Sequence, residues 1–388
     1  MPHSPWFFTL PLDRRRFLIV VAGAAAHAAL RPYAGLARKA AMGAPPLQPW
    51  SLPDRAPATE IEIARSLVGA AVLAPSHWNT QPWRFEIEGA SIRLLGDPER
   101  ALPVTDPERR AMRLSLGAAL ENLLVAARAW GLRPTVGYRP LADATDAVAE
   151  VTWTGGKVQR DRGLFHAIVE RRTNRHEYDG RGLFRENRAA LSIQVSHDFR
   201  LHWIDDRERI QAIGQLTHDA VHEQVLDRAA QAERFAWTRF DDGARLRGDG
   251  ISVGALALGG PAKWLAGRYL NPRSWFLGQG AGSLGKQARK CVRSAGALVL
   301  LTAPQRREES WLVGGQVYER FALKATQLGI AHQPISAPIE QERFRPDLLA
   351  HFGAAGEDPL MFVRLGHADQ PRGSERRAVA LVTSFRKA

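Results

Sequence analysis

The residues APSHWNTQPWRF at positions 74–85 combine side chains that could bind a planar heteroaromatic molecule. Each carboxamide in the stretch offers both a hydrogen-bond donor and an acceptor, which suits the polar edge of a fused ring system. The tryptophans could pack against the flat face of such a ring. A surface loop that closes a helix is the simpler alternative. The predicted contact residues are Pro75, Ser76, His77, Asn79 and Gln81.

A second segment, ERRTNRHEY at positions 170–178, ends a predicted helix and concentrates cationic and hydroxyl groups. Guanidinium groups donate paired, charge-assisted hydrogen bonds, which a phosphomonoester dianion can accept. Arginines at a helix C-terminus also complement the helix dipole, and this simpler explanation accounts for Arg171 and Arg172. It accounts poorly for Thr173 and Arg175. The segment therefore predicts a phosphate-binding site formed by these four residues.

Helices and strands on both sides must position these two segments. Residues 59–73 predict a helix, because Thr59 can cap its N-terminus and Pro75 must end it. An alternating hairpin is predicted at 83–87 and 91–95. Further helices are predicted at 111–130, 161–172, 207–237 and 311–328, and further strands at 148–153, 199–204, 297–302 and 360–365.

Two of the predicted helices repeat one pattern, at positions 117–132 and 315–330, which align without a gap. Both begin on glycine, carry a glutamate at the same place (Glu121 and Glu319), and end on glycine followed by a branched apolar residue. Unrelated buried helices that end in a glycine cap can look alike. A duplicated unit is the other explanation, and it would make the chain two similar halves in tandem.

Together, the arginine cluster and the carboxamide turn resemble the nitroreductase superfamily. In that family an Arg-x-Ser/Thr-x-Lys/Arg cluster holds the FMN phosphate, and a Pro-Ser-x-x-Asn-x-Gln-Pro-Trp turn from the second subunit of a dimer covers the ring system. Here the turn precedes the cluster, an order that resembles the Acg-like branch, in which one chain imitates the dimer. The resemblance implies an α/β (α+β) fold of tandem nitroreductase-like halves, an intramolecular pseudo-dimer with mixed sheets wrapped by helices.

The resemblance also implies how the chain is divided. The glycine-rich residues 243–285 would form a flap or lid over the site. The predicted segments are a signal peptide and leader at 1–42, a Pro-rich linker at 43–58, the first half at 59–155, and the second half, which contains the lid, at 156–388.

Two more segments enter the site by resemblance alone. HQPISAP at 332–338 matches the loop that family members pass along the isoalloxazine ring, and GSERRA near the C-terminus matches a basic segment that returns to the phosphate. A surface loop and a solvated tail are the alternatives. The residues implied in cofactor binding are Pro334, Ile335, Ser336, Arg376 and Arg377.

The resemblance implies FMN as the bound cofactor and NAD(P)H as a transient co-substrate, with electrons passed to a small-molecule acceptor such as a nitroaromatic or a quinone. Arg175 is the candidate for stabilising the charge of the reduced flavin. No catalytic side chain is assigned, because the flavin does the chemistry. The alternative is an FMN storage or sequestration protein whose lid covers the flavin.

Composition limits the other classes of function. The net charge is +13, but arginines are interleaved with acidic residues and no nucleic-acid-binding motif is present, so nucleic acid is not an expected partner. Cys291 is the single cysteine, which excludes an intrachain disulfide and a thiolate metal cluster. We expect a monomer that contains an internal pseudo-dimer.

The N-terminus resembles a twin-arginine signal peptide. Arg14, Arg15, Phe17 and Leu18 lead into an apolar run of small residues that is too short to span a bilayer comfortably. We therefore expect export to the periplasm by the twin-arginine route, without stable membrane insertion afterwards. A frayed helix and an uncleaved anchor are the alternatives.

Two further motifs nearly match other kinds of site. GAGSLGKQ at 280–287 lacks the Ser or Thr that ends a phosphate-binding P-loop, and a mobile flap explains its glycines better. His218 and His222 lie one helical turn apart, but no third ligand is evident in the sequence, so no metal site is predicted.

Overall fold

The computed structural model describes residues 50–138, 147–156, 161–195, 198–253 and 276–386. The predicted leader, the start of the predicted linker and the middle of the predicted lid lie outside these residues. Within the described part of the chain, none of the helices combines the length and the apolar character needed to span a lipid bilayer.

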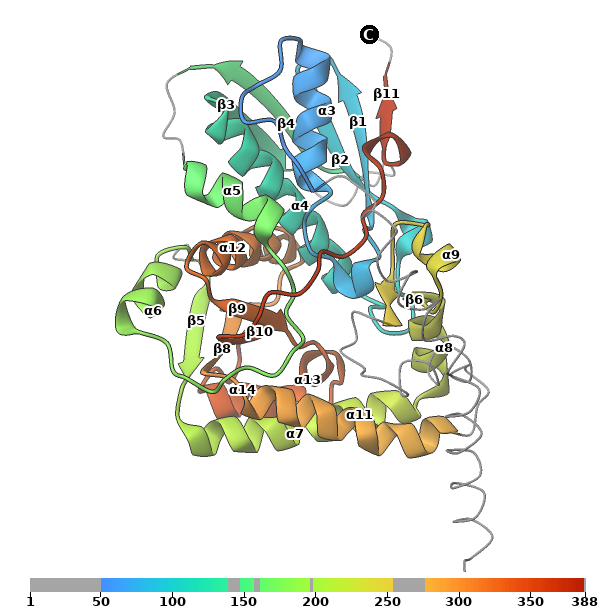
Figure 1. Cartoon of the computed structure of the whole chain (residues 1–388), viewed down its shortest axis with the longest axis vertical. Coiled ribbons are helices and arrows are strands. Elements are labelled where there is room, and N and C mark those ends of the chain that lie inside the picture. The colour runs from blue at the N-terminus through green and yellow to red at the C-terminus, as the bar shows by residue number, and fades with distance from the viewer. Residues whose placement is uncertain (1–49, 139–146, 157–160, 196–197, 254–275, 387–388) are drawn as a thin grey trace, which may run out of the picture. The chain divides into compact units, whose positions relative to one another are not determined.

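Five strands form the sheet of the first lobe, in the order β11–β1–β2–β4–β3 (Figure 1). Neighbouring strands are antiparallel except β1 and β11, which run parallel. The hairpin predicted from the alternating pattern is confirmed by β1 and β2. The strands are β1 (Trp83–Glu88), β2 (Ser91–Gly96), β3 (Leu132–Tyr138), β4 (Ala147–Gly155) and β11 (Thr383–Phe385).

Alternation along β1 gives the first sheet one buried face. Phe85 and Ile87 are buried, and the residues beside them carry charged side chains on the other face. The apolar face packs against α3 (Glu60–Ala71) and α4 (Arg110–Ala129). A capping box at Thr59 begins α3, as the sequence predicted.

Four strands form the sheet of the second lobe, in the order β5–β8–β10–β9. Each neighbouring pair among these strands is antiparallel, so mixed pairing is confined to the first lobe's sheet. Strands β5, β8 and β10 were predicted, whereas the short β9 was not. Their bounds are β5 (Arg200–Ile204), β8 (Ala297–Ala303), β9 (Ala331–Pro334) and β10 (Asp358–Gly366).

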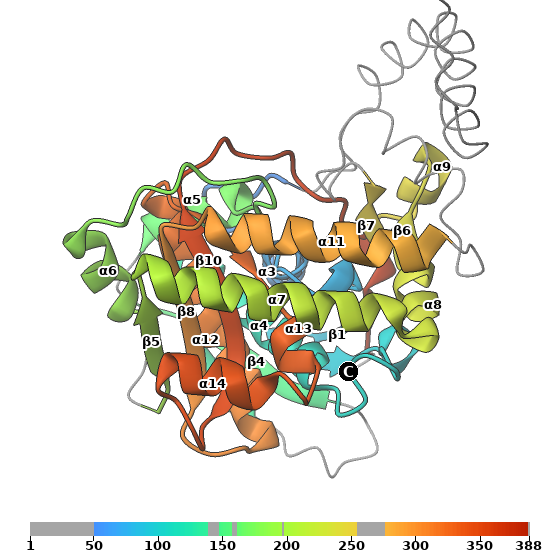
Figure 2. The ribbon, with the colours of Figure 1, turned by 90° about the horizontal axis from the view of Figure 1, so that it is seen from below.

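Strand β8 is apolar throughout because both of its faces are buried. Val299 belongs to a cluster formed with α12 (Glu308–Gln327) on one face. Leu300 belongs to a second cluster, formed with α7 (Arg207–Leu226) and α11 (Phe276–Arg293) on the other face. Figure 2 shows α7 and α11 lying side by side across this sheet. The mixed α/β fold with helix-covered sheets is thus confirmed.

The two repeated helices, α4 and α12, pack against each other at the centre of the molecule (Figure 1). A Cβ atom on Gly117 would lie 1.9 Å from the Leu312 carbonyl oxygen, and a Cβ on Gly315 would lie 2.1 Å from the Leu114 carbonyl oxygen. The contact is reciprocal, since Leu114 and Leu312 occupy the same place in the repeat. Such reciprocity is typical of two units related by a twofold axis.

The long polar helix predicted at 207–237 is two helices, α7 and α8 (Arg228–Ala236). Asp227 makes the break, because its carboxylate accepts hydrogen bonds from the Ala229 and Ala230 amides and so caps α8. A capping residue inside a polar pattern is easily overlooked, and the single-helix prediction was wrong for this reason.

The P-loop-like residues 280–287 lie inside α11, so the prediction of a flap was wrong for this part of the lid. Gly285 permits close packing of α11 on α7, because a Cβ there would lie 2.9 Å from His218 Cδ2. The glycine therefore serves contact between helices. The remaining elements are η1 (His77–Asn79), η2 (Pro98–Arg100), α5 (Arg162–Glu170), α6 (Arg185–Ser192), β6 (Thr238–Arg239), α9 (Asp242–Arg245), β7 (Ile251–Ser252), α13 (Ala337–Glu340), α14 (Arg345–Phe352) and η4 (Val379–Leu381).

The C-terminal segment crosses from the second lobe back to the first (Figure 1). After β10 it passes the arginine cluster, where the Asn174 side chain donates to the Asp369 carbonyl at 2.8 Å. It then joins the first sheet, and the Phe85 amide donates to the Val382 carbonyl at 2.7 Å. The predicted second half therefore contributes a strand, β11, to the sheet of the predicted first half.

Candidate functional site

A pocket brings together the two segments that the sequence singled out. Pro75, Ser76 and Asn79 line it from the first lobe. The cluster after α5 lines it from the second lobe, with Arg171, Arg172, Thr173 and Arg175. Two predicted motifs far apart in the sequence thus form one cavity wall.

The carboxamide turn has a strained backbone. Trp78, Asn79 and Gln81 all have left-handed conformations, with φ values of 46°, 56° and 52°. Residues other than glycine adopt this region at a cost, and asparagine tolerates it best. Two hydroxyl groups hold the turn: Ser76 Oγ accepts from the Gln81 amide at 2.9 Å, and Ser115 Oγ accepts from the His77 amide at 3.2 Å. The local sequence gave no sign of this strain.

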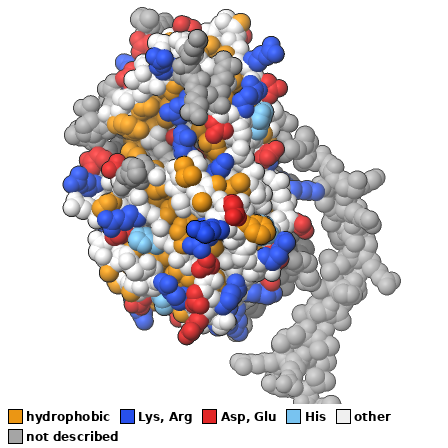
Figure 3. Space-filling model, turned by 90° about the vertical axis from the view of Figure 1, so that its left-hand side faces the viewer, with side chains coloured by type: hydrophobic (Ala, Val, Ile, Leu, Met, Phe, Trp, Pro, Cys, Tyr) orange, Lys and Arg blue, Asp and Glu red, His pale blue; other side chains and the backbone are white. Residues whose placement is uncertain are grey.

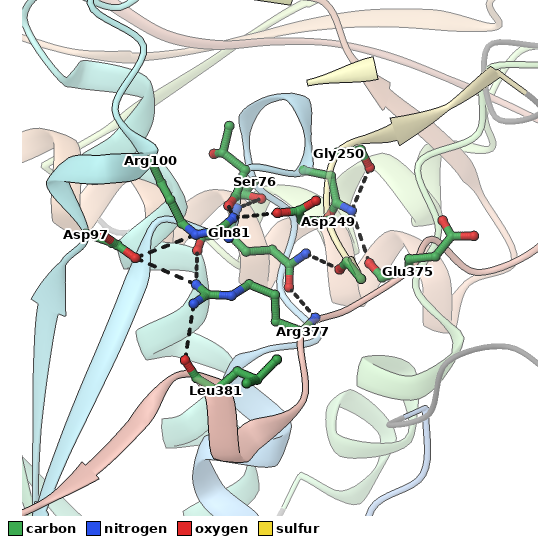
Figure 4. Close-up of polar contacts among 12 residues, drawn as sticks. Ser76, Gln81, Asp97, Arg100, Asp249, Gly250, Glu375, Arg377 and Leu381 are labelled. Atoms are coloured by element: carbon green, nitrogen blue, oxygen red, sulfur yellow. Dashed lines mark hydrogen bonds and ion pairs between the residues drawn. The ribbon is translucent and has the colours of Figure 1, made fainter. Parts of the chain in front are cut away.

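Both carboxamides of the turn are bonded to backbone groups of the protein, and Figure 4 shows the bonds of Gln81. Asn79 Nδ2 donates to the Gly250 carbonyl at 2.9 Å. Gln81 Nε2 donates to the Gly248 carbonyl at 2.7 Å, and Gln81 Oε1 accepts from the Arg377 amide at 2.9 Å. The turn therefore holds two segments against the pocket: residues 248–252, called the strap, and residues 374–377, called the tail.

The strap is also fixed by an ion-pair network around Asp249 (Figure 4). Asp249 is buried and lies 2.6 Å from Arg239 Nη2, which belongs to the second lobe. Its other carboxylate oxygen lies 2.9 Å from Arg100 Nη1 in the first lobe. Removing one partner from such a buried network leaves an uncompensated charge, which is strongly destabilising. The closed position of the strap is therefore held by both lobes.

Arg171 and Arg376 are buried arginines that line the pocket. Arg376 Nη1 donates to Asn79 Oδ1 at 3.0 Å and Nη2 donates to the Ala74 carbonyl at 3.1 Å. Arg171 Nη2 reaches the Leu73 carbonyl at 3.4 Å. Among the described residues, Arg171 Nη1 and Arg376 Nε have no hydrogen-bond acceptor. Buried donors of this kind need a partner, and a bound anion would provide one.

The pocket has an excess of positive charge. Burial lowers the pKa of Arg376 to about 9 and those of Arg172 and Arg175 to about 10, and the charges of neighbouring arginines add to each shift. Glu375 also lines the pocket, but its carboxylate is already paired with another arginine, because it lies 2.6 Å from Arg245 Nη2. On the face shown in Figure 3, basic and acidic side chains are instead interspersed. An anion in the pocket would relieve the repulsion between the arginines.

Trp50 also lines the pocket and was not predicted as a site residue. The guanidinium of Arg172 lies 4.0 Å from the centre of its ring, and that of Arg376 lies 4.9 Å away. Trp50 Nε1 donates to the Ser374 carbonyl of the tail at 3.0 Å. Cation–π contacts of this kind orient both guanidinium groups. The sequence interpretation missed Trp50 because it lies in the Pro-rich stretch that was predicted to be a linker.

Several predicted residues do not line the pocket. His77 Nε2 lies 3.2 Å from a Glu340 carboxylate oxygen. Arg377 donates to the carbonyl oxygens of Gln81 and Leu381 at 3.3 and 3.2 Å. The predicted residues that are absent from the pocket lining are His77, Gln81, Pro334, Ile335, Ser336 and Arg377.

The predicted ring-contacting loop adjoins the arginine cluster without lining the pocket. Thr173 and His332 form an isolated parallel bridge, and the Asn174 amide donates to the His332 carbonyl at 3.0 Å. Beyond this bridge Pro334 ends β9, and the Ile335 amide donates to the Phe362 carbonyl at 2.8 Å. Ser336 then precedes α13. These three residues therefore lie within the second lobe, between β9 and α13.

No three His, Cys, Asp or Glu side chains form a group that could hold a metal ion in the part of the chain that the structure describes. The rings of His218 and His222 stack with their centres 6.1 Å apart. His218 Nδ1 lies 2.8 Å from an Asp219 carboxylate oxygen.

Two buried titratable side chains, Glu319 and His332, lie next to Arg171. Burial raises the pKa of Glu319 to about 8, against the opposing charge of Arg171. Burial lowers the pKa of His332 to about 3, and the charge of Arg171 adds to the shift. Neither ring nitrogen of His332 has a hydrogen-bond partner among the described residues. At neutral pH His332 is therefore uncharged and Glu319 is largely protonated.

The free energy of unfolding should be constant between about pH 4.5 and 6.5, because the effects of Glu319 and His332 on it have opposite signs and cancel there. It should decline on both sides of this range. Above pH 6.5 the folded state keeps a Glu319 proton that the unfolded state has lost, so stability should fall by about 2 kcal/mol as pH nears 8. Below pH 4.5 the unfolded state binds a proton at its exposed imidazole that buried His332 does not accept. Urea unfolding of the protein and of Glu319→Gln measures this. The variant should lose the alkaline decline, and an unchanged decline would contradict the assignment.

Along most of its length the chain is similar to proteins named as NAD(P)H nitroreductases. "Putative NAD(P)H nitroreductase Rv3131" of Mycobacterium tuberculosis strain H37Rv is 28% identical over 336 residues, covering 84% of this chain and 92% of that protein. "Putative NAD(P)H nitroreductase acg" of the same strain is 27% identical over 342 residues, covering 84% of this chain and 96% of that protein. No family model matches the chain.

Solved nitroreductases overlap with this chain less completely. The FMN-dependent nitroreductase NfnB from Mycobacterium smegmatis, in complex with NADPH, is 19% identical with a TM-score of 0.38, covering 58% of this chain and 99% of that chain. A nitroreductase with bound FMN from Desulfitobacterium hafniense is 13% identical with a TM-score of 0.36, covering 55% of this chain and 94% of that chain. Scores this low support no argument about the fold, which rests on the strand order and helix packing described above.

Proposed function

We propose that this chain binds FMN in the arginine-lined pocket and acts as an NAD(P)H-dependent oxidoreductase on a small acceptor such as a nitroaromatic or a quinone. Bound FMN would supply the electron-transfer chemistry. The observation that carries the proposal is the pocket itself, where buried arginine donors that have no acceptor in the described part of the chain meet the carboxamide turn. The similarity to relatives named as NAD(P)H nitroreductases supports the same class of activity.

The residues present fit a phosphomonoester well. Arg171, Thr173 and Arg175 can donate to phosphate oxygens from the second lobe, and Arg376 can donate from the tail. Trp50 covers the guanidinium of Arg172 in the cluster and fixes its orientation. The four arginines would hold the anion by charge-assisted hydrogen bonds and exclude neutral ligands that cannot offset their charge.

FMN storage is a second candidate function, and the closed strap favours it. The turn that was predicted to meet the flavin edge is bonded to the strap through Asn79 and Gln81, and Asp249 joins the strap to both lobes. A strap fixed this firmly would slow exchange of the cofactor and limit the approach of NAD(P)H. Because lid movement often limits turnover, slow opening would favour retention of FMN over catalysis.

Spectroscopy of the purified chain tests both functions. The protein should be yellow, or become yellow when incubated with FMN, and heat should release a flavin with the mass of FMN. Rapid bleaching by NADPH without oxygen, with steady oxidation of NADPH when a quinone or nitroaromatic is added, would identify a reductase. A tightly bound flavin that NADPH does not reduce would identify the storage protein. Colourless protein that takes up no FMN would overturn both.

A further inference from the structure

Arg171 connects the pocket to a buried carboxyl group. Its guanidinium lines the pocket, and its Nε atom lies 3.3 Å from Glu319 Oε1. The Arg171 side chain is 2% exposed and the Glu319 side chain is fully buried. One guanidinium is thus shared between a carboxyl group on α12 and whatever anion enters the pocket. Charges this deeply buried are weakly screened, so the two anions would compete for it.

The groups around Glu319 come from each element packed against it. Helix α4 supplies the Asn122 amide and the carboxyl group of Glu121, and the tail supplies Arg376. Tyr318 neighbours it on α12 itself, and His332 on β9 lies beside Arg171. Of these groups, Arg171 and Arg376 favour the ionised carboxylate, whereas burial and Glu121 favour the protonated form.

We propose that Glu319 is a positioning residue for the anion pocket: it takes up a proton when an anion binds, and so leaves the charge of Arg171 to the ligand. The inference rests on the proposed function, since it takes the FMN phosphate as that anion. It assigns to Glu319 no contact with the ligand. Its action passes entirely through Arg171.

Linkage fixes the direction of the effect. The pKa of Glu319 in the free protein is about 8, so near this pH a substantial fraction of the carboxyl groups is ionised and paired with Arg171. An anion bound at Arg171 raises that pKa further, because it adds negative charge and occupies the guanidinium. Binding must therefore be accompanied by proton uptake, and FMN affinity must fall as pH rises above 8.

The repeat supplies a matched control. Glu121 occupies the place of Glu319 in the first repeated helix and is also buried, with a pKa raised by burial. Its carboxylate pairs with Arg320, which does not line the pocket. Glu121→Gln therefore removes the same type of group from the same type of environment without removing the partner of Arg171.

The experiment is calorimetric titration of the flavin-free protein with FMN, in buffers of different ionisation enthalpy. Between about pH 7 and 9 the FMN phosphate is already a dianion, since its second pKa is about 6, so any proton taken up belongs to the protein. The wild-type protein should take up about half a proton near the pKa of Glu319, and Glu121→Gln should do the same at a lower pH, because Glu121 favours the protonated form of Glu319. Glu319→Gln should take up none from this group and should bind FMN about tenfold more tightly than the wild type at about pH 9.

The outcomes separate this inference from the proposed function. FMN binding without proton uptake in the wild type, or with equal uptake in Glu319→Gln, would overturn the role of Glu319 and leave the FMN site standing. Uptake that persists in the variant would belong to Arg376 or another arginine. No FMN binding by the wild type across this pH range would overturn the proposed function, and this inference with it. Should Glu319→Gln fail to fold, the pH dependence of the wild-type uptake decides: a midpoint near pH 8 supports Glu319, and a midpoint near pH 9 assigns the proton to Arg376 and overturns the inference.

Discussion

Replacing Arg172 and Arg175 together with alanine should weaken FMN binding by a factor of about 100 to 10,000. Each charge-assisted hydrogen bond contributes about 1.5–3 kcal/mol, and a tenfold change in affinity corresponds to about 1.4 kcal/mol. Both side chains line the pocket, and both have pKa values lowered by burial and by neighbouring arginines. Fluorescence titration of the flavin-free variant with FMN measures the loss.

The matched control is Arg181→Ala combined with Arg185→Ala, which removes the same net charge from exposed positions outside the pocket. This variant should bind FMN with nearly wild-type affinity, because distant surface charges are screened by salt. Stoichiometric FMN in the purified Arg172→Ala, Arg175→Ala protein would show that the phosphate lies elsewhere. An equal loss in both double variants would show that the effect comes from overall charge.

Arg171 is a poorer choice for this experiment although it is more deeply buried. Its replacement by alanine would leave the buried, largely protonated carboxyl group of Glu319 without its polar neighbour, and an unsatisfied buried polar group costs about 1–3 kcal/mol. Loss of FMN from that variant could then reflect unfolding. The same reasoning applies to Arg376, whose guanidinium holds Asn79 and the carbonyl groups at the end of α3.

Local chemistry made part of the site predictable. The turn at Asn79 and the cluster at Arg171 were found because each concentrates unusual side chains within a few residues, and the structure places both at one pocket. Trp50 and Asp249 were missed because each acts on partners far away in the sequence. Glu319 was noted only as part of a repeat, since its burial beside Arg171 depends on how two helices pack.

For the two carboxamides, the residue type predicts hydrogen bonding but not the partner. Asn79 and Gln81 were expected to bind the edge of a flavin because each offers a donor and an acceptor. The backbone of the strap and of the tail offers complementary groups as well, and in the structure it binds them. The sequence indicated the capacity of these amides for paired hydrogen bonds. It could not identify the partner, because a peptide group and a heterocycle edge present similar atoms.

In the fold too, elements set by a local sequence pattern were predictable, whereas those set by distant partners were not. The hairpin of β1 and β2 and the buried strand β8 follow from local patterns, namely alternation and a continuous apolar run. Strand β11 has three residues, and it forms because the C-terminal segment is carried across the molecule to β1. No periodicity over so short a stretch could have predicted it. The repeat indicated two equivalent helices, α4 and α12, but the close contact between their glycines depends on how the two lobes pack.

Replacing Gly117 or Gly315 with alanine should destabilise the protein by about 3 kcal/mol or more, although alanine is the better helix former. The new Cβ would lie 1.9 Å from the Leu312 carbonyl oxygen in the first case and 2.1 Å from the Leu114 carbonyl oxygen in the second. These atoms belong to helix backbone and cannot rotate away, so the two helices must separate. Urea unfolding measures the loss of stability.

Gly69→Ala is the matched control, because Gly69 is also a buried glycine within a helix. Its Cβ would meet the nearest side chains at 3.8 and 4.0 Å, which is ordinary van der Waals contact. This variant should gain about 0.5–1 kcal/mol from the higher helix propensity of alanine. A gain of stability in Gly69→Ala together with a loss in the Gly117 and Gly315 variants would show that the close contact lies between the two repeated helices. A stability gain in all three variants would mean that α4 and α12 do not approach so closely, and that the reciprocal contact between the lobes is absent.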